Sequence, residues 1–113
     1  MKRKLEYRTS QGLQNALNNA LRARDQSGMM QALLAEIGFS GRETPTVSEM
    51  RRLIQREAYQ RLFDERNISK GTRVTIGKGT QLFTVESFDE TGRARFVELK
   101  GGTFPPNDLY WAG

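Results

Sequence analysis

Arginine and aromatic side chains at helical spacing are the residues of this sequence best suited to binding chemistry. Between residues 47 and 67 they recur every three or four positions, at Arg52, Arg56, Tyr59, Phe63 and Arg66. Guanidinium groups form paired hydrogen bonds with carboxylates and phosphates, and arginine and aromatic residues are enriched at protein interfaces. This face predicts a surface for an acidic protein or a nucleic-acid backbone. The alternative is structural: Tyr59 and Phe63 pack on the segment that follows, and the arginines are solvated or pair with nearby carboxylates.

Enzyme chemistry is disfavoured because two residue types are missing. The 113 residues include no His and no Cys, which removes the commonest general base, the commonest zinc ligand and the thiol nucleophile. Two carboxylate pairs, Asp64-Glu65 and Asp89-Glu90, have no partner base near them in the sequence. We predict no catalytic residue, no metal site and no cofactor.

Gly77-Lys78-Gly79-Thr80 resembles part of a phosphate-binding loop. The full spacing G-x-x-x-x-G-K-[ST] is absent, and the segment joins two predicted strands instead of a strand and a helix. We therefore interpret it as a turn.

Basic residues are in excess: Lys and Arg number 18 against 13 Asp and Glu, the net charge is +5 and the pI is about 10.0. Most of the excess lies in residues 1–67, and the start of the chain contributes Lys2, Arg3, Lys4 and Arg8. This start is a frayed tail, an added strand at a sheet edge or an arm that contacts phosphates.

Apolar periodicity divides the first part of the chain into three helices. Leu13, Leu17 and Leu21 share one face of the first helix, and Ser27-Gly28 interrupts the pattern before the second. Thr46 and Glu49 form a capping-box signature at the start of the third. We expect these helices over residues 10–26, 29–37 and 47–65.

From residue 68 onward, short β-branched and aromatic runs alternate with Gly-rich turns. Strands are predicted over residues 73–76, 81–88 and 93–99, with hairpin turns at residues 89–92 and 100–102. Residues 105–108 suit a short 3₁₀ turn before a last strand over residues 109–111. So many short strands predict a small closed or half-closed barrel. Because 46 residues build only a marginal core, we expect the third helix to pack against it.

Three turn motifs carry a family resemblance. They are Gly71-Thr72-Arg73-Val74, the run from Gly79 to Val85, and the run from Phe104 to Leu109. They resemble the patterns G-D-x-V, G-G-P-x-M-T-V and F-P-x-x-L of SH3-like barrels in small bacterial and phage proteins, in particular the YodC-like group. The chain departs from these patterns at Thr72, where Asp is usual, and after Gly79, where no Pro follows. The resemblance covers residues 68–113 and implies a fold, with no established activity.

Together these observations predict an α+β protein. A helical lobe over residues 1–67, with a basic tail over residues 1–8, precedes an SH3-like antiparallel β-barrel over residues 68–113 that is packed on the third helix. No apolar run approaches the roughly 18 residues of a membrane span, and the basic start leads into no apolar region. We therefore expect a cytoplasmic protein without a membrane partner.

The predicted function is a non-catalytic binding module, as in a small phage or bacterial accessory protein. Its partner is expected to be a protein, and its oligomeric state is not indicated. The predicted surface combines the arginine and aromatic residues above with the aromatic end of the barrel, at Phe104, Tyr110 and Trp111. Such aromatics line a groove for proline-rich peptides or close a core. The alternative function is nucleic-acid binding through the basic tail and the helical arginines.

Overall fold

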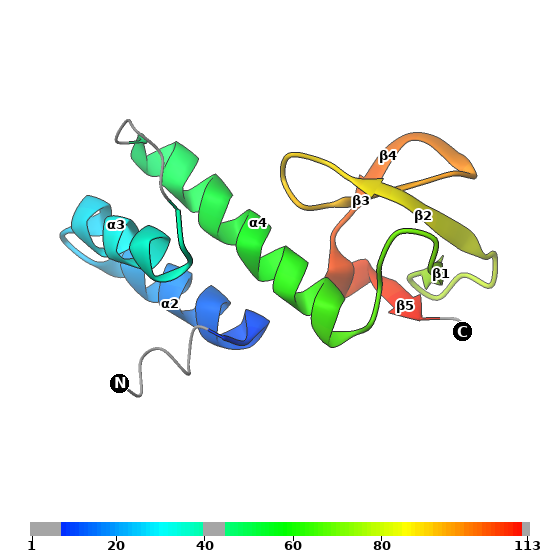
Figure 1. Cartoon of the computed structure of the whole chain (residues 1–113), viewed down its shortest axis with the longest axis horizontal. Helices are drawn as coiled ribbons and strands as arrows, with labels where there is room; N and C mark the ends of the chain where they lie inside the picture. Colours follow the sequence, from blue (N-terminus) through cyan, green and yellow to red (C-terminus); the bar gives the residue numbers. More distant parts are fainter. Residues whose placement is uncertain (1–7, 40–44, 112–113) are drawn as a thin grey trace.

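The computed structural model describes residues 8–39 and 45–111, and of Trp111 only the backbone. Within these residues three α-helices precede a curled, five-stranded antiparallel sheet, which confirms the α+β class (Figure 1). The elements are α2 (Ser10–Arg22), α3 (Gln26–Glu36), α4 (Val47–Glu65), β1 (Arg73–Ile76), β2 (Phe83–Phe88), β3 (Ala94–Phe96), β4 (Leu99–Phe104), the 3₁₀ helix η1 (Pro106–Asp108) and β5 (Leu109–Trp111).

The boundary between the first two helices lies earlier than the sequence predicted. α2 ends at Arg22, four residues before the expected end, and α3 begins at Gln26. The Asp25 side chain accepts a hydrogen bond of 3.0 Å from the backbone N–H of Gly28, so it caps α3. Ser27 and Gly28, which were expected to separate the helices, therefore lie in the first turn of α3.

α4 has the predicted bounds because both of its ends are encoded locally. Thr46 accepts a hydrogen bond from the N–H of Glu49 and caps the start. At the other end Asn67 takes a positive φ of 57°. The N–H of Ile68 then donates to the carbonyl of Phe63 at 2.9 Å, which is a Schellman ending. Since Phe63 and Ile68 are both buried, this ending turns the chain directly into the core of the sheet.

The strands are ordered β4-β3-β2-β1-β5. After β4 the chain passes through η1, and β5 then pairs with β1. The turn predicted at residues 100–102 is wrong. Phe96 pairs with Leu99 across a tight turn at Val97 and Glu98, and Gly101 lies within β4 with a φ of 80°. The Glu98 carboxylate stabilises this earlier turn because it accepts hydrogen bonds from the N–H and the hydroxyl of Thr84, at 2.6 and 2.8 Å.

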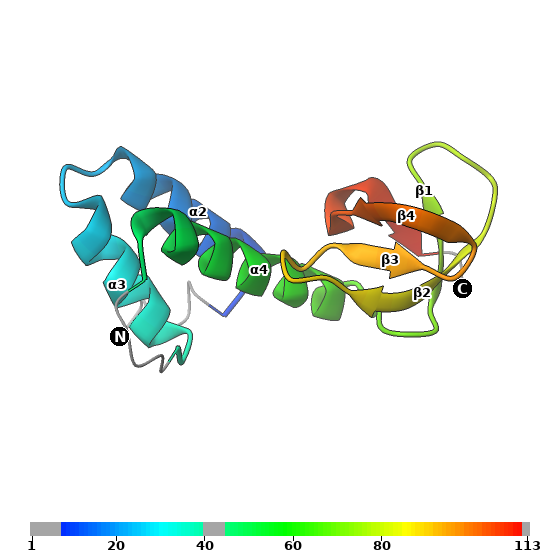
Figure 2. The same ribbon diagram turned by 90° about the horizontal axis from the view of Figure 1, so that it is seen from above.

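Two hydrophobic clusters share α4. The helical core consists of Leu13, Leu17, Ala20, Met30, Leu33, Leu34, Met50, Ile54 and Ala58. The sheet core consists of Phe63, Ile68, Val74, Val85, Ala94, Phe96 and Leu109. Figure 2 shows α4 leading from one lobe to the other. The radius of gyration, 15.4 Å, exceeds the value of about 13 Å expected for a compact domain of this length. The molecule is therefore elongated along α4.

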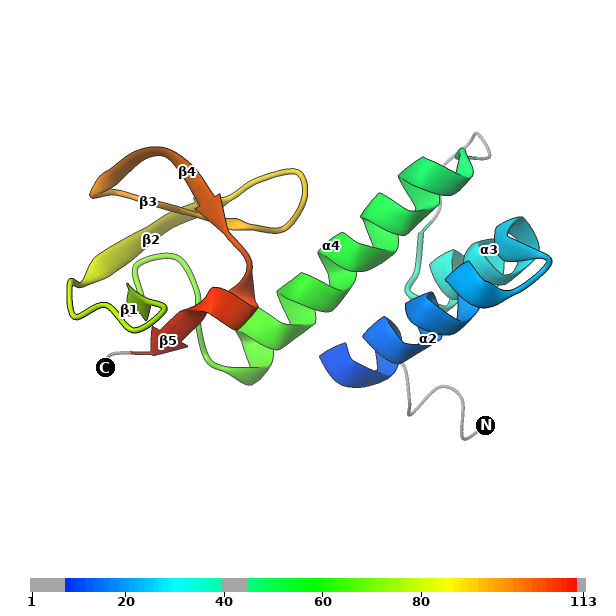
Figure 3. The ribbon, with the colours of Figure 1, turned by 180° about the vertical axis from the view of Figure 1, so that it is seen from behind.

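Polar and aromatic contacts join the lobes near the end of α4. The rings of Phe63 and Phe88 lie 4.8 Å apart, so the end of α4 packs on β2. Arg66 Nη1 donates to the carbonyl oxygen of Pro106 at 2.6 Å. Figure 3 shows η1 beside this end of α4. On the other side of the helix, Glu65 accepts hydrogen bonds from the N–H and the hydroxyl of Ser10, both at 2.7 Å, and so ties α2 to α4.

Candidate functional site

A cleft of about 500 Å³ lies between α4 and the tip of the β2–β3 hairpin. We call it the basic cleft. The described side chains that line it include three arginines and no carboxylate. They are Ser48, Arg51, Arg52, Gln55, Tyr59, Thr91 and Arg93. Guanidinium groups and neutral donors on facing walls form a site for anionic groups.

The first wall of the basic cleft is one face of α4. Positions 48, 51, 52, 55 and 59 fall on successive turns of the helix and so point the same way. The opposite face of α4 is fixed because Met50, Ile54 and Ala58 are buried in the helical core. This packing holds the backbone of the arginines in place while their side chains are exposed to solvent.

The second wall is the tip of the β2–β3 hairpin, which Asp89 organises. Its Oδ1 atom accepts hydrogen bonds from the N–H of Thr91, the hydroxyl of Thr91 and the N–H of Arg93, at 2.9, 2.7 and 2.9 Å. Burial by itself would raise the pKa of Asp89, but these hydrogen bonds and the charge of Arg95 outweigh it, so the pKa lies below its ordinary value. The ionised carboxylate therefore fixes the positions of Thr91 and Arg93.

Gly92 lets the hairpin tip approach the helix closely. Its φ is 86°, in the left-handed region that favours glycine. A Cβ atom at this position would lie 3.1 Å from the carbonyl oxygen of Arg56 and 3.3 Å from Cβ of Tyr59. The contact between Gly92 and the backbone of α4 therefore sets the distance between the two walls. It also places Tyr59 next to the hairpin tip.

The structure separates the five residues of the predicted helical surface. Arg52 and Tyr59 line the basic cleft, whereas the exposed Arg56 lines a different hollow of about 350 Å³ between α3 and α4. Phe63 is completely buried in the sheet core, so it cannot face a partner. Arg66 donates to the backbone carbonyls of Pro106 and Leu109. A helix has more than one face, and the sheet lobe covers the face that carries Phe63.

The aromatic end of the sheet is only partly exposed. Phe104 is half-buried, and its ring packs on Phe96 with ring centroids 6.0 Å apart. Tyr110 is 56% exposed, and for Trp111 the structure describes backbone pairing alone. The side chain of Trp111 lies outside the described atoms, so the predicted aromatic groove stays a prediction.

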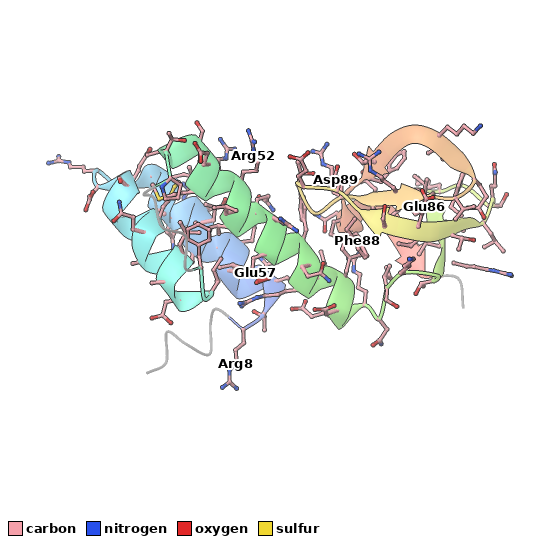
Figure 4. All side chains as sticks on the ribbon, turned by 45° about the horizontal axis from the view of Figure 1, so that its top comes forward. Arg8, Arg52, Glu57, Glu86, Phe88 and Asp89 are labelled. Carbon is pink, nitrogen blue, oxygen red and sulfur yellow. The ribbon has the colours of Figure 1, made fainter. Side chains whose placement is uncertain are left out.

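The predicted basic tail lies largely outside the described residues, which exclude Lys2, Arg3 and Lys4. Arg8 is exposed. Figure 4 shows Arg8 and Arg52 on opposite sides of the molecule, whereas Arg52 and Asp89 lie on the same side. Arg8 and the basic cleft thus do not form one continuous surface.

Five residues of the basic cleft were not predicted from the sequence: Ser48, Arg51, Gln55, Thr91 and Arg93. Arg51 could have been found, because it precedes Arg52 on the same helix. Thr91 and Arg93 belong to a hairpin whose docking on α4 depends on contacts between residues distant in sequence, such as Phe63 with Phe88. The pattern of charges in the sequence contains no signal for that approach.

Within residues 8–39 and 45–111, no group of three or more acidic side chains is arranged to hold a metal ion. None of the described helices is both long enough and apolar enough to cross a membrane. Comparison with protein-family models, curated protein sequences and solved structures finds no match. Of the two hollows described above, the basic cleft is the one whose lining brings three arginines together.

Proposed function

We propose that this protein is a non-catalytic binding module that engages a protein partner on the side where α4 meets the β2–β3 hairpin. The observation that carries the proposal is the basic cleft, in which Arg51, Arg52 and Arg93 converge from two elements. Arginine is enriched at protein interfaces, and buried arginine anchors contribute much of the binding energy there.

Three of the four carboxylates in the two sequence pairs make structural hydrogen bonds. Asp89 holds the hairpin turn through Thr91 and Arg93. Glu65 binds the first residue of α2 through both of its oxygens, and Asp64 accepts a hydrogen bond from Gln60. These roles, together with a sequence that lacks His and Cys, support a binding function over a catalytic one.

An SH3-like barrel is the assignment we propose for the sheet lobe. Its strand order, β4-β3-β2-β1-β5, and the 3₁₀ helix that precedes β5 support this assignment. The fold alone does not identify an activity. It does supply a small scaffold that can present a hairpin tip to a partner. The suggestion of a phage or bacterial accessory protein remains a prediction from the sequence resemblance.

Nucleic-acid binding is the second candidate function. The net charge of +5 favours it, because phosphate contacts by Lys and Arg dominate nonspecific binding. The positions of Arg8 and Arg52 on opposite sides of the molecule favour the protein partner (Figure 4).

Affinity capture from a bacterial lysate tests the proposed function. The bait is the full chain, either unaltered or carrying Arg51→Gln with Arg52→Gln. The matched control carries Arg22→Gln with Arg24→Gln, which removes the same charge from exposed positions at and just beyond the end of α2. We expect a protein that is captured by the unaltered and control chains and lost with the cleft variant, before and after nuclease treatment.

Two results would count against a protein partner. Capture that disappears after nuclease treatment would favour the nucleic-acid alternative. Capture that survives the cleft substitutions would show that a protein binds elsewhere on the molecule.

A further inference from the structure

We infer that the basic cleft recognises a short acidic segment of its protein partner, with the carboxylates of that segment bound by Arg51, Arg52 and Arg93. This inference rests on the proposed function and adds the chemistry of the ligand. It follows from the charges inside the cleft, the charges around it and the rigidity of its walls.

The interior of the cleft has one sign of charge and many hydrogen-bond donors. Two guanidinium groups come from α4 and one from the hairpin. A carboxylate accepts paired hydrogen bonds from a guanidinium group, and hydroxyl or amide donors such as Ser48 and Gln55 can satisfy its remaining lone pairs. A volume of about 500 Å³ lies in the range of clefts that enclose a ligand-sized group. A cleft of this size can hold a few acidic side chains, but it is too small to hold a broad protein surface.

The surroundings of the cleft oppose a long polyanion. Within one residue of the lining, each wall carries an exposed carboxylate: Glu49 next to Ser48 on α4, and Glu90 next to Thr91 on the hairpin tip. Over its whole length α4 has four arginines and four carboxylates, so it offers no continuous basic face. A nucleic-acid backbone carries regularly spaced negative charges and needs a row of cations, whereas a short acidic segment can end inside the cleft.

Both walls hold their positions without the ligand. The hydrogen bonds of Asp89 fix the turn, and Gly92 rests on the backbone of α4. A preformed site loses less conformational entropy on binding. The three arginines can therefore act together on one ligand.

The test uses fluorescein-labelled octaglutamate as the probe and fluorescence anisotropy of the full chain as the measurement. We expect saturable binding that weakens between about 50 and about 300 mM salt, because the contacts are ionic. The variant with Arg51→Gln and Arg52→Gln should bind about tenfold more weakly or worse, since it loses two of the three cationic groups. Arg93→Gln, which alters the hairpin wall alone, should also weaken binding. Arg22→Gln with Arg24→Gln should leave it unchanged.

Three results would overturn the inference: no binding of octaglutamate, equal binding by the cleft variant, or tighter cleft-dependent binding of labelled octathymidylate. Far-ultraviolet circular dichroism of every variant establishes that it is folded, as expected for substitutions at exposed side chains. If octaglutamate fails while capture of a protein still depends on Arg51 and Arg52, the acidic ligand is wrong and the proposed function stands. If capture itself is independent of both arginines, the proposed function fails.

Discussion

Arg66 illustrates how one residue can connect two lobes. Its Nη1 atom reaches from the end of α4 to the carbonyl of Pro106, and at 3.4 Å to that of Leu109. Replacing it by Met keeps most of the apolar stem and removes the donors. We expect Arg66→Met to lower the free energy of unfolding by about 1–2 kcal/mol, the scale of a hydrogen bond with a charged partner. Urea unfolding measures the change.

The control for this substitution is Arg22→Met, which removes the same group from an exposed position in the last turn of α2. It should change the unfolding free energy by less than about 0.5 kcal/mol. Equal effects of the two substitutions would show that the hydrogen bonds of Arg66 do not stabilise the fold.

Asp89 and Glu98 predict how stability changes with acid. Hydrogen bonds from the N–H and the hydroxyl of Thr84 lower the pKa of Glu98, as those at the hairpin tip lower that of Asp89. A carboxyl group with a lowered pKa in the folded state stabilises that state above its unfolded pKa of about 4. The contribution is lost as the pH falls below about 4 and through the still lower folded pKa.

We therefore expect the unaltered chain to have a higher Tm than the double variant Asp89→Asn with Glu98→Gln at pH 6. The difference should shrink steadily as the pH falls below about 4, because both carboxylates then become protonated. Thermal unfolding followed by circular dichroism measures it. A difference that is constant with pH would mean that neither charge matters to the fold.

Single residues were predictable where their role depends on near neighbours in the sequence. Thr46 begins α4 and Asn67 ends it, and the structure gives Asn67 a positive φ of 57°. The roles of Phe63 and Arg66 depend on residues 25 to 43 positions away, such as Phe88 and Pro106. Helical spacing alone could not distinguish a binding surface from a contact between lobes.

At the scale of elements, the docking of the β2–β3 hairpin on α4 depends on Gly92. We expect Gly92→Ala to destabilise the protein by about 1–3 kcal/mol, because it combines an unfavourable φ with a close contact to the carbonyl of Arg56. Gly71→Ala is the matched control: its φ is 91°, and a Cβ atom there would have no neighbour within 4 Å. It should cost only about 1 kcal/mol.

The comparison of these variants isolates the contact between hairpin and helix from the backbone preference. Urea unfolding gives the two free energies. If Gly92→Ala costs no more than Gly71→Ala, the hairpin tip is free to move away from α4, and the preformed cleft is incorrect.

The elements were predicted unevenly, for a physical reason. The strands over residues 73–76 and 109–111 and the 3₁₀ turn between residues 105 and 109 agree with the structure, because Gly and Pro mark their ends. The prediction of the β3–β4 turn was wrong because the Gly-rich segment at residues 100–102 has the composition of a turn. The actual turn at Val97 and Glu98 is stabilised by Thr84, which lies 14 residues from Glu98 in the sequence.

At the scale of the whole molecule, α4 passes through both hydrophobic clusters. We expect Leu17→Ala, a completely enclosed site in the helical core, to cost about 2–5 kcal/mol. One continuous helix contributes to both clusters, so we expect the two lobes to unfold together. In the Leu17→Ala variant, the opening free energy of the slowest-exchanging amides should therefore fall by the same amount in β1 and β2 as in α2. Native-state hydrogen exchange measures both. Loss of protection confined to the helices would show that the lobes unfold separately.

The overall α+β arrangement was the most predictable feature, since periodicity changes from helical to alternating near residue 68. The location of the basic cleft was the least predictable. It is formed by residues of α4 and by residues near position 92, which come together only because the ring of Phe88 packs on Phe63 and Gly92 packs on Arg56.

The uninterrupted course of α4 has a consequence for chain length. One extra residue in the middle of this helix would rotate everything after it by about 100° around the helix axis and shift it by about 1.5 Å. Gly92 would then face a different side of the helix, and the arginines of the two walls would no longer converge. Insertions and deletions should therefore be excluded from the stretch between Arg52 and Phe63 and from the β2–β3 hairpin tip, and tolerated in loops that do not build the cleft.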